Sequence, residues 1–111
     1  DVATGWRVAP MICADTWNPP LVHLAAAQDA TLMSVAVSSA LEAVGEGFDN
    51  PAGWDVNLRF HALTYALPIV MANRLGRDDG LLFWGGPRVQ VRGGRGAGVG
   101  NQWGGPTFHR Y

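Results

Sequence analysis

Residues 11–19 decide the fold, and they run Met11-Ile12-Cys13-Ala14-Asp15-Thr16-Trp17-Asn18-Pro19. A short apolar run ends on the only cysteine of the chain, and the pair Asn18-Pro19 then opens a helical pattern. This order predicts a strand, a turn and a helix, with the cysteine at the end of a sheet. A thiolate there could attack carbonyl or nitrile carbon, and a helix N-terminus just beyond it favours negative charge. The alternative is a buried cysteine without chemistry, because free cysteines are among the most buried residues.

The composition fits one small domain with a sparsely charged surface. The chain has 111 residues and only 15% of them are charged, whereas about 25% is typical of soluble domains. We therefore expect part of its surface to contact more chain or a partner. The net charge of -1 gives no electrostatic argument for nucleic acid or an anionic membrane. No stretch is long and apolar enough to predict a membrane span. A single cysteine allows no internal disulfide, so we expect a reducing, cytoplasmic location.

Apolar periodicity predicts alternating strands and helices. Residues 1–12 are predicted to form a turn and then a strand, and further strands are predicted over 31–40 and 69–73. A turn over 74–80 then leads to a strand pair or a bulged strand over 81–91, which Gly85-Gly86-Pro87 interrupts. The strand over 31–40 carries apolar residues at successive positions, which is typical of a parallel strand buried on both faces. Pro10 suits an edge strand or a bulge, because proline cannot donate to a sheet ladder.

Two amphipathic helices are predicted between these strands. The first covers residues 18–29, with Asn18 as its N-cap, and its inner face is predicted from Leu21, Leu24, Ala25 and Gln28. The second covers residues 54–67, and its inner face is predicted from Val56, Phe60, Leu63 and Leu67. Strands that alternate with helices indicate a parallel sheet with right-handed crossovers.

The segment from Ile12 to Pro19 resembles the nucleophile segment of the nitrilase superfamily, the carbon–nitrogen hydrolases. In that family an isoleucine and the cysteine are followed by an acid two residues on, then by an aromatic residue and often a proline. The order continues downstream, where residues 48–63 resemble the helix after the nucleophile, 70–76 the next strand and 83–89 a glycine-rich hairpin strand. We therefore assign residues 1–91 to a partial carbon–nitrogen hydrolase domain and residues 92–111 to a glycine-rich, low-complexity tail.

The resemblance implies an α/β fold that is part of a nitrilase-like α-β-β-α sandwich, with the N-terminal half absent. In the family the strand before the cysteine is interior, and Pro10 departs from that pattern. The family also tends to form oligomers, so we expect a homo-oligomer, with no nucleic-acid or membrane partner.

The resemblance also implies a function for the full-length protein. It implies hydrolysis of a small-molecule amide, N-carbamoyl amine or nitrile through a thioester on Cys13. We expect the Ala14 backbone N–H to help hold the oxyanion, and Asp15 to order the turn. Trp17 and Ser38 are expected to line the substrate site, with core packing as the alternative for Trp17 and turn entry as that for Ser38.

The catalytic set that the resemblance implies is incomplete in this chain. The family uses a glutamate as general base and acid, and a lysine that stabilises the tetrahedral intermediate; both lie upstream of the nucleophile. All eight basic residues here are arginine, so we expect the 111-residue chain alone to be inactive. A non-catalytic fragment or interaction module that retains half the fold is the alternative. We expect no cofactor, and the histidines and the cysteine have no metal-ligand spacing. His23 as a base for Cys13, and Glu42 or Glu46 as site acids, are further alternatives.

Overall fold

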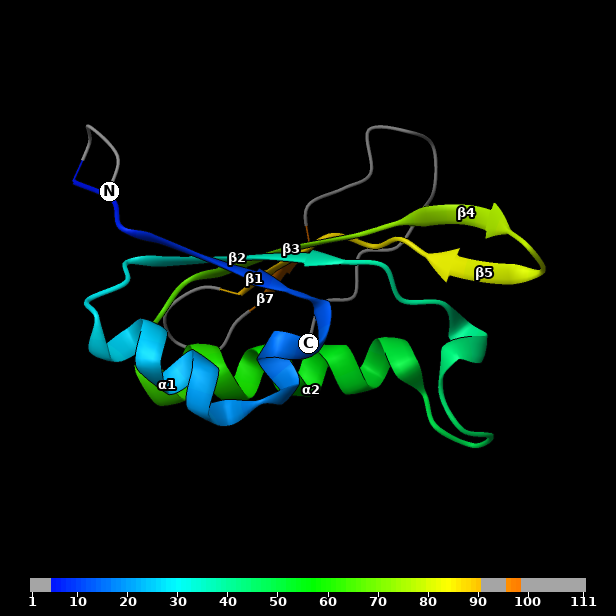
Figure 1. Ribbon diagram of the computed structural model, residues 1–111, viewed down its shortest axis with the longest axis horizontal. Helices are drawn as coiled ribbons and strands as arrows, with labels where there is room; N and C mark the ends of the chain where they lie inside the picture. The colour runs from blue at the N-terminus through cyan, green and yellow to red at the C-terminus, as the bar shows by residue number, and fades with distance from the viewer. Residues whose placement is uncertain (1–4, 91–95, 99–111) are drawn as a thin grey trace.

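The computed structural model describes residues 5–90 and 96–98, in which two helices cover one face of a five-stranded sheet (Figure 1). The sheet order is β1-β2-β3-β6-β7, with bounds Val8–Ile12 for β1, Leu32–Val37 for β2, Ile69–Asn73 for β3, Arg88–Gln90 for β6 and Gly96–Gly98 for β7. The helices are α1 (Pro19–Ala27) and α2 (Asn50–Tyr65), and the 3-10 turns are η1 (Cys13–Trp17) and η2 (Leu41–Ala43). A hairpin of β4 (Leu75–Asp78) and β5 (Leu81–Trp84) extends beyond the sheet.

The strand pairing brings the ends of three strands to one edge. β1, β2 and β3 are parallel, as predicted, and β6 and β7 add antiparallel to them. The register aligns Ile12 with Ala36 and Ala36 with Ala72, so the chain leaves all three strands at the same level. Helices α1 and α2 form the two crossovers and lie on the same face, as crossovers of one hand require (Figure 1). In such a sheet the carboxyl edge is where ligands bind.

The hydrophobic core lies between the sheet and the two helices. Its largest fully buried side chains are Met33, Ile69 and Met71 from the sheet and Leu58 and Val22 from the helices. Burial alternates along β2, and the opposite face of the sheet, with Ser34, Ala36, Val70 and Ala72, is exposed. The predicted burial of 31–40 on both faces is therefore wrong for the described residues.

Both helices turn a different side inward from the predicted one. In α1 the buried residue is Val22, whereas Leu24 is 53% exposed. Helix α2 begins four residues before the predicted start, because the Asp49 carboxylate accepts a hydrogen bond from the Ala52 N–H (3.0 Å) and caps it there. Its predicted inner residues Val56, Phe60 and Leu63 are exposed, and its buried row is Asn50, Trp54, Leu58, His61 and Ala62.

Pro10 is accommodated because β1 is an edge strand of the described sheet. The Arg7 carbonyl accepts a hydrogen bond from the Leu32 N–H, so odd-numbered residues of β1 face β2. Alternation then turns the backbone of Pro10 toward the open edge, where its missing N–H removes no ladder bond. The interior position that the family resemblance implies is not seen in the described residues.

The remaining predictions concern the hairpin and the tail. The predicted turn over 74–80 is wrong, since most of it forms β4, and only Asp79 and Gly80 make the turn, both with positive φ (47° and 80°). Such two-residue turns match the twist of a hairpin. The predicted interruption at 85–87 does separate two strands, β5 and β6. Of the predicted tail, only β7 is described and the rest lies outside the described residues. In the described part, no helix is long and apolar enough to span a membrane.

Candidate active site

Cys13 lies at the carboxyl end of β1 in a strained backbone conformation. Its φ of 44° lies in the left-handed region, which costs a non-glycine residue about 1–3 kcal/mol. Asp29, Ala66 and Asp79 share this conformation, and Cys13 is the one of the four that lines a pocket. The Asp15 carboxylate accepts a hydrogen bond from the Ile12 N–H (2.8 Å) and so closes the turn across the cysteine. Asp15 therefore orders the turn, as predicted from the sequence.

Helix α2 holds the same turn from the other side. The Thr16 hydroxyl donates to the Cys13 carbonyl (3.1 Å), and Thr16 is completely buried. The Thr16 carbonyl in turn accepts from the Asn57 side-chain amide (3.0 Å) and lies 2.8 Å from His61 Nε2. Two side chains of α2 thus converge on one carbonyl three residues after the cysteine. The two contacts from α2 do not follow from sequence spacing, because 41 and 45 residues separate the partners.

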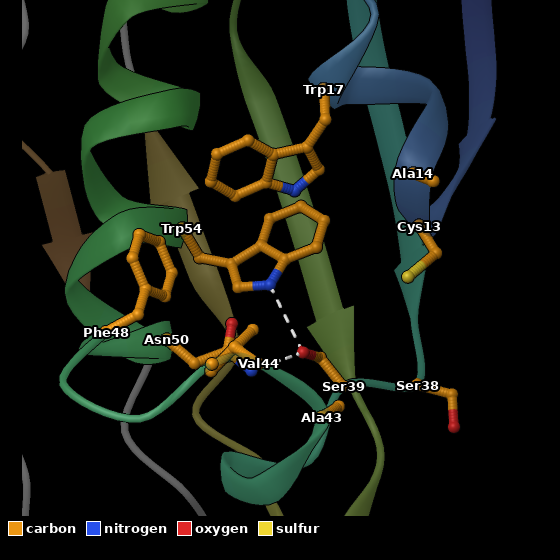
Figure 2. A pocket seen from close by; sticks show the side chains of 11 residues that line it. Cys13, Ala14, Trp17, Ser38, Ser39, Ala43, Val44, Phe48, Asn50 and Trp54 are labelled. Carbon is orange, nitrogen blue, oxygen red and sulfur yellow. Dashed lines mark hydrogen bonds between the residues drawn. The ribbon is translucent and has the colours of Figure 1, made fainter.

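A cavity of about 580 Å³ opens beside the cysteine (Figure 2). Its lining comes from η1, from the segment between β2 and α2, and from the first turns of α2, and it comprises Cys13, Ala14, Trp17, Ser38, Ser39, Ala43, Val44, Gly45, Phe48, Asn50 and Trp54. The four predicted site residues Cys13, Ala14, Trp17 and Ser38 are all among them. The Cys13 sulfur points to the side on which Trp17 and Trp54 lie, whereas the Ser38 hydroxyl points away from these rings (Figure 2).

Ser39 is the centre of a hydrogen-bond network at the floor of this pocket. The Asn50 side-chain amide donates to the Ser39 hydroxyl and to the Ala40 carbonyl, both at 2.7 Å. Asn73 at the end of β3 bonds the Ser39 backbone twice, accepting from its N–H (2.8 Å) and donating to its carbonyl (3.1 Å). The network fixes the end of β2 against β3 and α2. The sequence places Ser39 at a strand end that faces the site, but it does not identify Asn50 and Asn73, since buried asparagines give no apolar signal.

Sequence analysis also missed Phe48 and Trp54, two aromatic residues that line the pocket. The Trp17 and Trp54 rings meet edge to face with centroids 5.4 Å apart, and the Trp54 indole N–H donates to the Ser39 hydroxyl (3.4 Å). Phe48 lies beside Trp54 in Figure 2. Phe48 and Trp54 belong to the segment that resembles the helix after the nucleophile in the family. That resemblance is the one sequence feature that could have identified them.

None of the residues that line the pocket is charged. The Glu42 carboxylate instead accepts a hydrogen bond from the Leu82 N–H (2.9 Å). This bond, the Glu42 backbone N–H and the charge of Arg77 hold the pKa of Glu42 below its ordinary value. His23 lies against Tyr65, with 3.3 Å between its Nδ1 and the phenol oxygen, and neither residue lines the pocket. Among the residues that the structure describes, no three histidine, cysteine or acidic side chains cluster to hold a metal ion.

Fold and site together define an α/β protein with a strained cysteine at the carboxyl edge of a parallel sheet. A probable nitrilase of Schizosaccharomyces pombe is 31% identical to the chain over 85 residues, which cover 75% of this chain and 28% of the yeast protein. An amidase of the nitrilase superfamily from Nesterenkonia matches the structure with a TM-score of 0.75 and 25% identity, over 90% of this chain and 36% of the amidase. No family model matches the chain.

A second structure of the Nesterenkonia amidase bears on the cysteine. It matches with a TM-score of 0.67 and 27% identity, over 86% of this chain and 35% of the amidase, and it carries the acetamide moiety of fluoroacetamide covalently added at its active-site cysteine. The chain thus spans about a third of the length of the proteins it matches. The predicted resemblance to the nitrilase superfamily is confirmed: this chain is similar in sequence and in fold to part of proteins of that superfamily.

Proposed function

We propose that the protein carrying this chain hydrolyses a non-peptide carbon–nitrogen bond in an amide, an N-carbamoyl amine or a nitrile, with Cys13 as the nucleophile. The observation that carries the proposal is the position of Cys13, in left-handed backbone at the end of a parallel strand and in the wall of a pocket. The covalent adduct at the active-site cysteine of the Nesterenkonia amidase supports the same role for Cys13.

For an amide, the proposed reaction runs through a thioester. The Cys13 sulfur attacks the carbonyl carbon, and the oxyanion that forms accepts a hydrogen bond from the Ala14 N–H, since N–H groups in a first helical turn have no partner within the turn. The carbon–nitrogen bond breaks, the amine leaves with a proton, and water then cleaves the thioester to a carboxylic acid and restores the thiol. By the resemblance, a glutamate moves these protons and a lysine stabilises the tetrahedral intermediate, and both lie in the part of the fold outside this chain.

A second candidate is a non-catalytic binding module that retains this part of the fold. One observation favours it, which is that no carboxylate or ammonium group lines the pocket beside Cys13. The thiol then has no acid–base partner among the described residues that line the pocket. On either account, we expect no turnover by the 111 residues alone.

The deciding experiment compares the protein with its Cys13→Ala and Cys13→Ser variants. Release of ammonia or amine is measured with a series of amides, N-carbamoyl amines and nitriles. We expect both variants to lose about a thousandfold or more in kcat, because the covalent step disappears. His23→Ala, which changes an exposed residue away from the pocket, is the control and should keep its rate. Turnover that survives in Cys13→Ala contradicts the proposal, and binding without turnover by the wild-type protein favours the second candidate.

A further inference from the structure

The pocket beside Cys13 presents aromatic surface to a ligand. Trp54 is only 2% exposed and is fixed by its bond to Ser39, so it forms a rigid wall. Trp17 and Phe48 are 45% and 51% exposed, although both line a concave site. About half of the surface of each residue is therefore exposed, and a bound molecule could cover part of it. Burying aromatic surface of this kind is a main source of small-molecule affinity.

Gly53 on α2 makes the position of the Phe48 ring possible. A Cβ atom at residue 53 would lie 2.5 Å from Phe48 Cζ and 3.5 Å from Trp17 Cη2. The Phe48 ring thus packs directly on the helix backbone, in space that only glycine leaves free. Gly53 has an ordinary helical conformation, so the close approach of the ring is what requires glycine here.

The Ser39, Asn50 and Trp54 side chains of the pocket are hydrogen-bonded to one another. The Ser39 hydroxyl accepts from Asn50 and from Trp54, and the Asn50 amide also donates to the Ala40 carbonyl. Because no lining residue of this chain is charged, the wall that this chain contributes offers no counter-charge to a carboxylate or ammonium group that packs against it. The desolvation of an unpaired charge is strongly unfavourable.

From these features we propose that the pocket binds the uncharged, aromatic part of a substrate whose scissile carbon lies at Cys13, and that it rejects substrates with a carboxylate there. The volume of about 580 Å³ is within the range of small-molecule sites and admits a substituted ring. The inference rests on the proposed function, because it takes Cys13 as the reacting group.

The test uses three chloroacetamides that alkylate Cys13. The thiol sulfur forms a bond to the methylene carbon, chloride leaves, and the thiol proton passes to the buffer. The probes are N-benzyl-2-chloroacetamide, 2-chloroacetamide and N-chloroacetylglycine, each corrected for its intrinsic rate with glutathione. Trypsin releases the peptide Val8–Arg59, which holds the only cysteine of the chain, so mass spectrometry reports on this thiol alone. We expect the benzyl probe to react about tenfold faster than 2-chloroacetamide, and the carboxylate probe to react more slowly than either.

Matched phenylalanine variants locate the effect. Phe48→Ala should remove most of the benzyl advantage, measured as the ratio of the benzyl rate to the 2-chloroacetamide rate of the same variant. Phe60→Ala should keep that ratio, because Phe60 is 56% exposed and does not line the pocket. Gly53→Ala displaces the ring without deleting it and should also reduce the advantage. Equal benzyl and 2-chloroacetamide rates in the wild-type protein overturn the inference, and so does an equal loss in Phe48→Ala and Phe60→Ala.

The outcomes separate this inference from the proposed function. A benzyl advantage that depends on Phe48, in a protein without Cys13-dependent turnover, supports the aromatic site and counts against hydrolysis. Cys13-dependent turnover without a benzyl advantage overturns the aromatic site and leaves hydrolysis standing.

Discussion

At the scale of single residues, His61 connects helix α2 to the turn η1, which begins at Cys13. The side chain is 2% exposed, and its Nε2 lies 2.8 Å from the Thr16 carbonyl. A carbonyl only accepts, so Nε2 carries the proton and donates, which leaves Nδ1 as an acceptor without a partner among the described residues. The Thr16 hydroxyl in turn donates a hydrogen bond to the Cys13 carbonyl, so a side chain that holds Thr16 in place also holds the backbone of Cys13. His61 thus acts on the cysteine through Thr16, as a positioning residue.

Replacing His61 should therefore depend on whether the new side chain donates. We expect His61→Leu to lower the free energy of unfolding by about 1–3 kcal/mol, because it leaves the buried carbonyl with one donor instead of two. His61→Gln carries an amide that can donate to the same carbonyl and should keep most of the stability. Denaturant unfolding measures the stability, and the 2-chloroacetamide rate reports on the position of Cys13.

A histidine on the surface provides the control for this pair. His23→Leu removes an exposed side chain and should change stability by no more than about 0.5 kcal/mol. Equal losses in His61→Leu and His61→Gln would show that the imidazole serves only to fill space.

At the scale of elements, helix α2 shows where sequence patterns stop being informative. It carries two apolar rows, one through Val56 and Phe60 and one through Trp54 and Leu58, and spacing alone cannot choose between them. The structure buries the second row, together with the polar residues Asn50 and His61. Their hydrogen-bond partners lie on segments far away in the sequence, so only the tertiary structure identifies the buried face.

Strands and the local part of the site were more predictable. The bounds of β3, Ile69–Asn73, were predicted from the sequence, because a short apolar run before a polar residue leaves few alternatives. Cys13 and Ser38 were placed at strand ends by the same local logic, and the register of parallel strands brings such ends together. Phe48 reaches the pocket through the packing of α2, which no local pattern predicts.

The hydrogen bond between Glu42 in η2 and Leu82 in β5 should depend on pH. The pKa of Glu42 is lowered, chiefly by the Leu82 N–H, so this bond stabilises the folded chain above the ordinary pKa of a glutamate and is lost as the pH falls through the lowered value. We expect the Leu82 amide resonance to shift in that acidic window in nuclear magnetic resonance spectra. Glu42→Gln should abolish the shift and Glu46→Gln should preserve it. A shift that persists in Glu42→Gln would assign the titration to another group.

At the scale of the whole molecule, the described part of the chain exposes much apolar surface. The sheet is covered by helices on one face only, and Ile12, Val56 and Leu75 are 71%, 69% and 64% exposed. With only 15% charged residues, few charges separate these side chains. An exposed apolar area of this size is typical of a surface that contacts another part of the protein or a partner chain. Homo-oligomerisation, expected from the family resemblance, stays a prediction.

We expect the 111-residue chain to self-associate when it is expressed alone. Its mass by light scattering after size exclusion should rise with concentration, because the open sheet face and the β1 edge are uncovered. Val70→Thr, on the open face, should weaken the association more than Leu63→Thr on α2, since both side chains are exposed but only Val70 lies on the sheet. A monodisperse monomer with a sharp thermal transition would contradict the expectation.

The left-handed backbone at Cys13 also has a consequence for evolution, because stability and the proposed chemistry favour different residues at this position. Glycine would adopt a φ of 44° without strain, and asparagine would adopt it at less cost than cysteine. Selection for a durable fold alone would therefore drive this position away from cysteine. A lineage that no longer needed the sulfur would gain stability by discarding it in a single mutational step. Under the proposed function, this position keeps a cysteine for its sulfur although the backbone favours other residues.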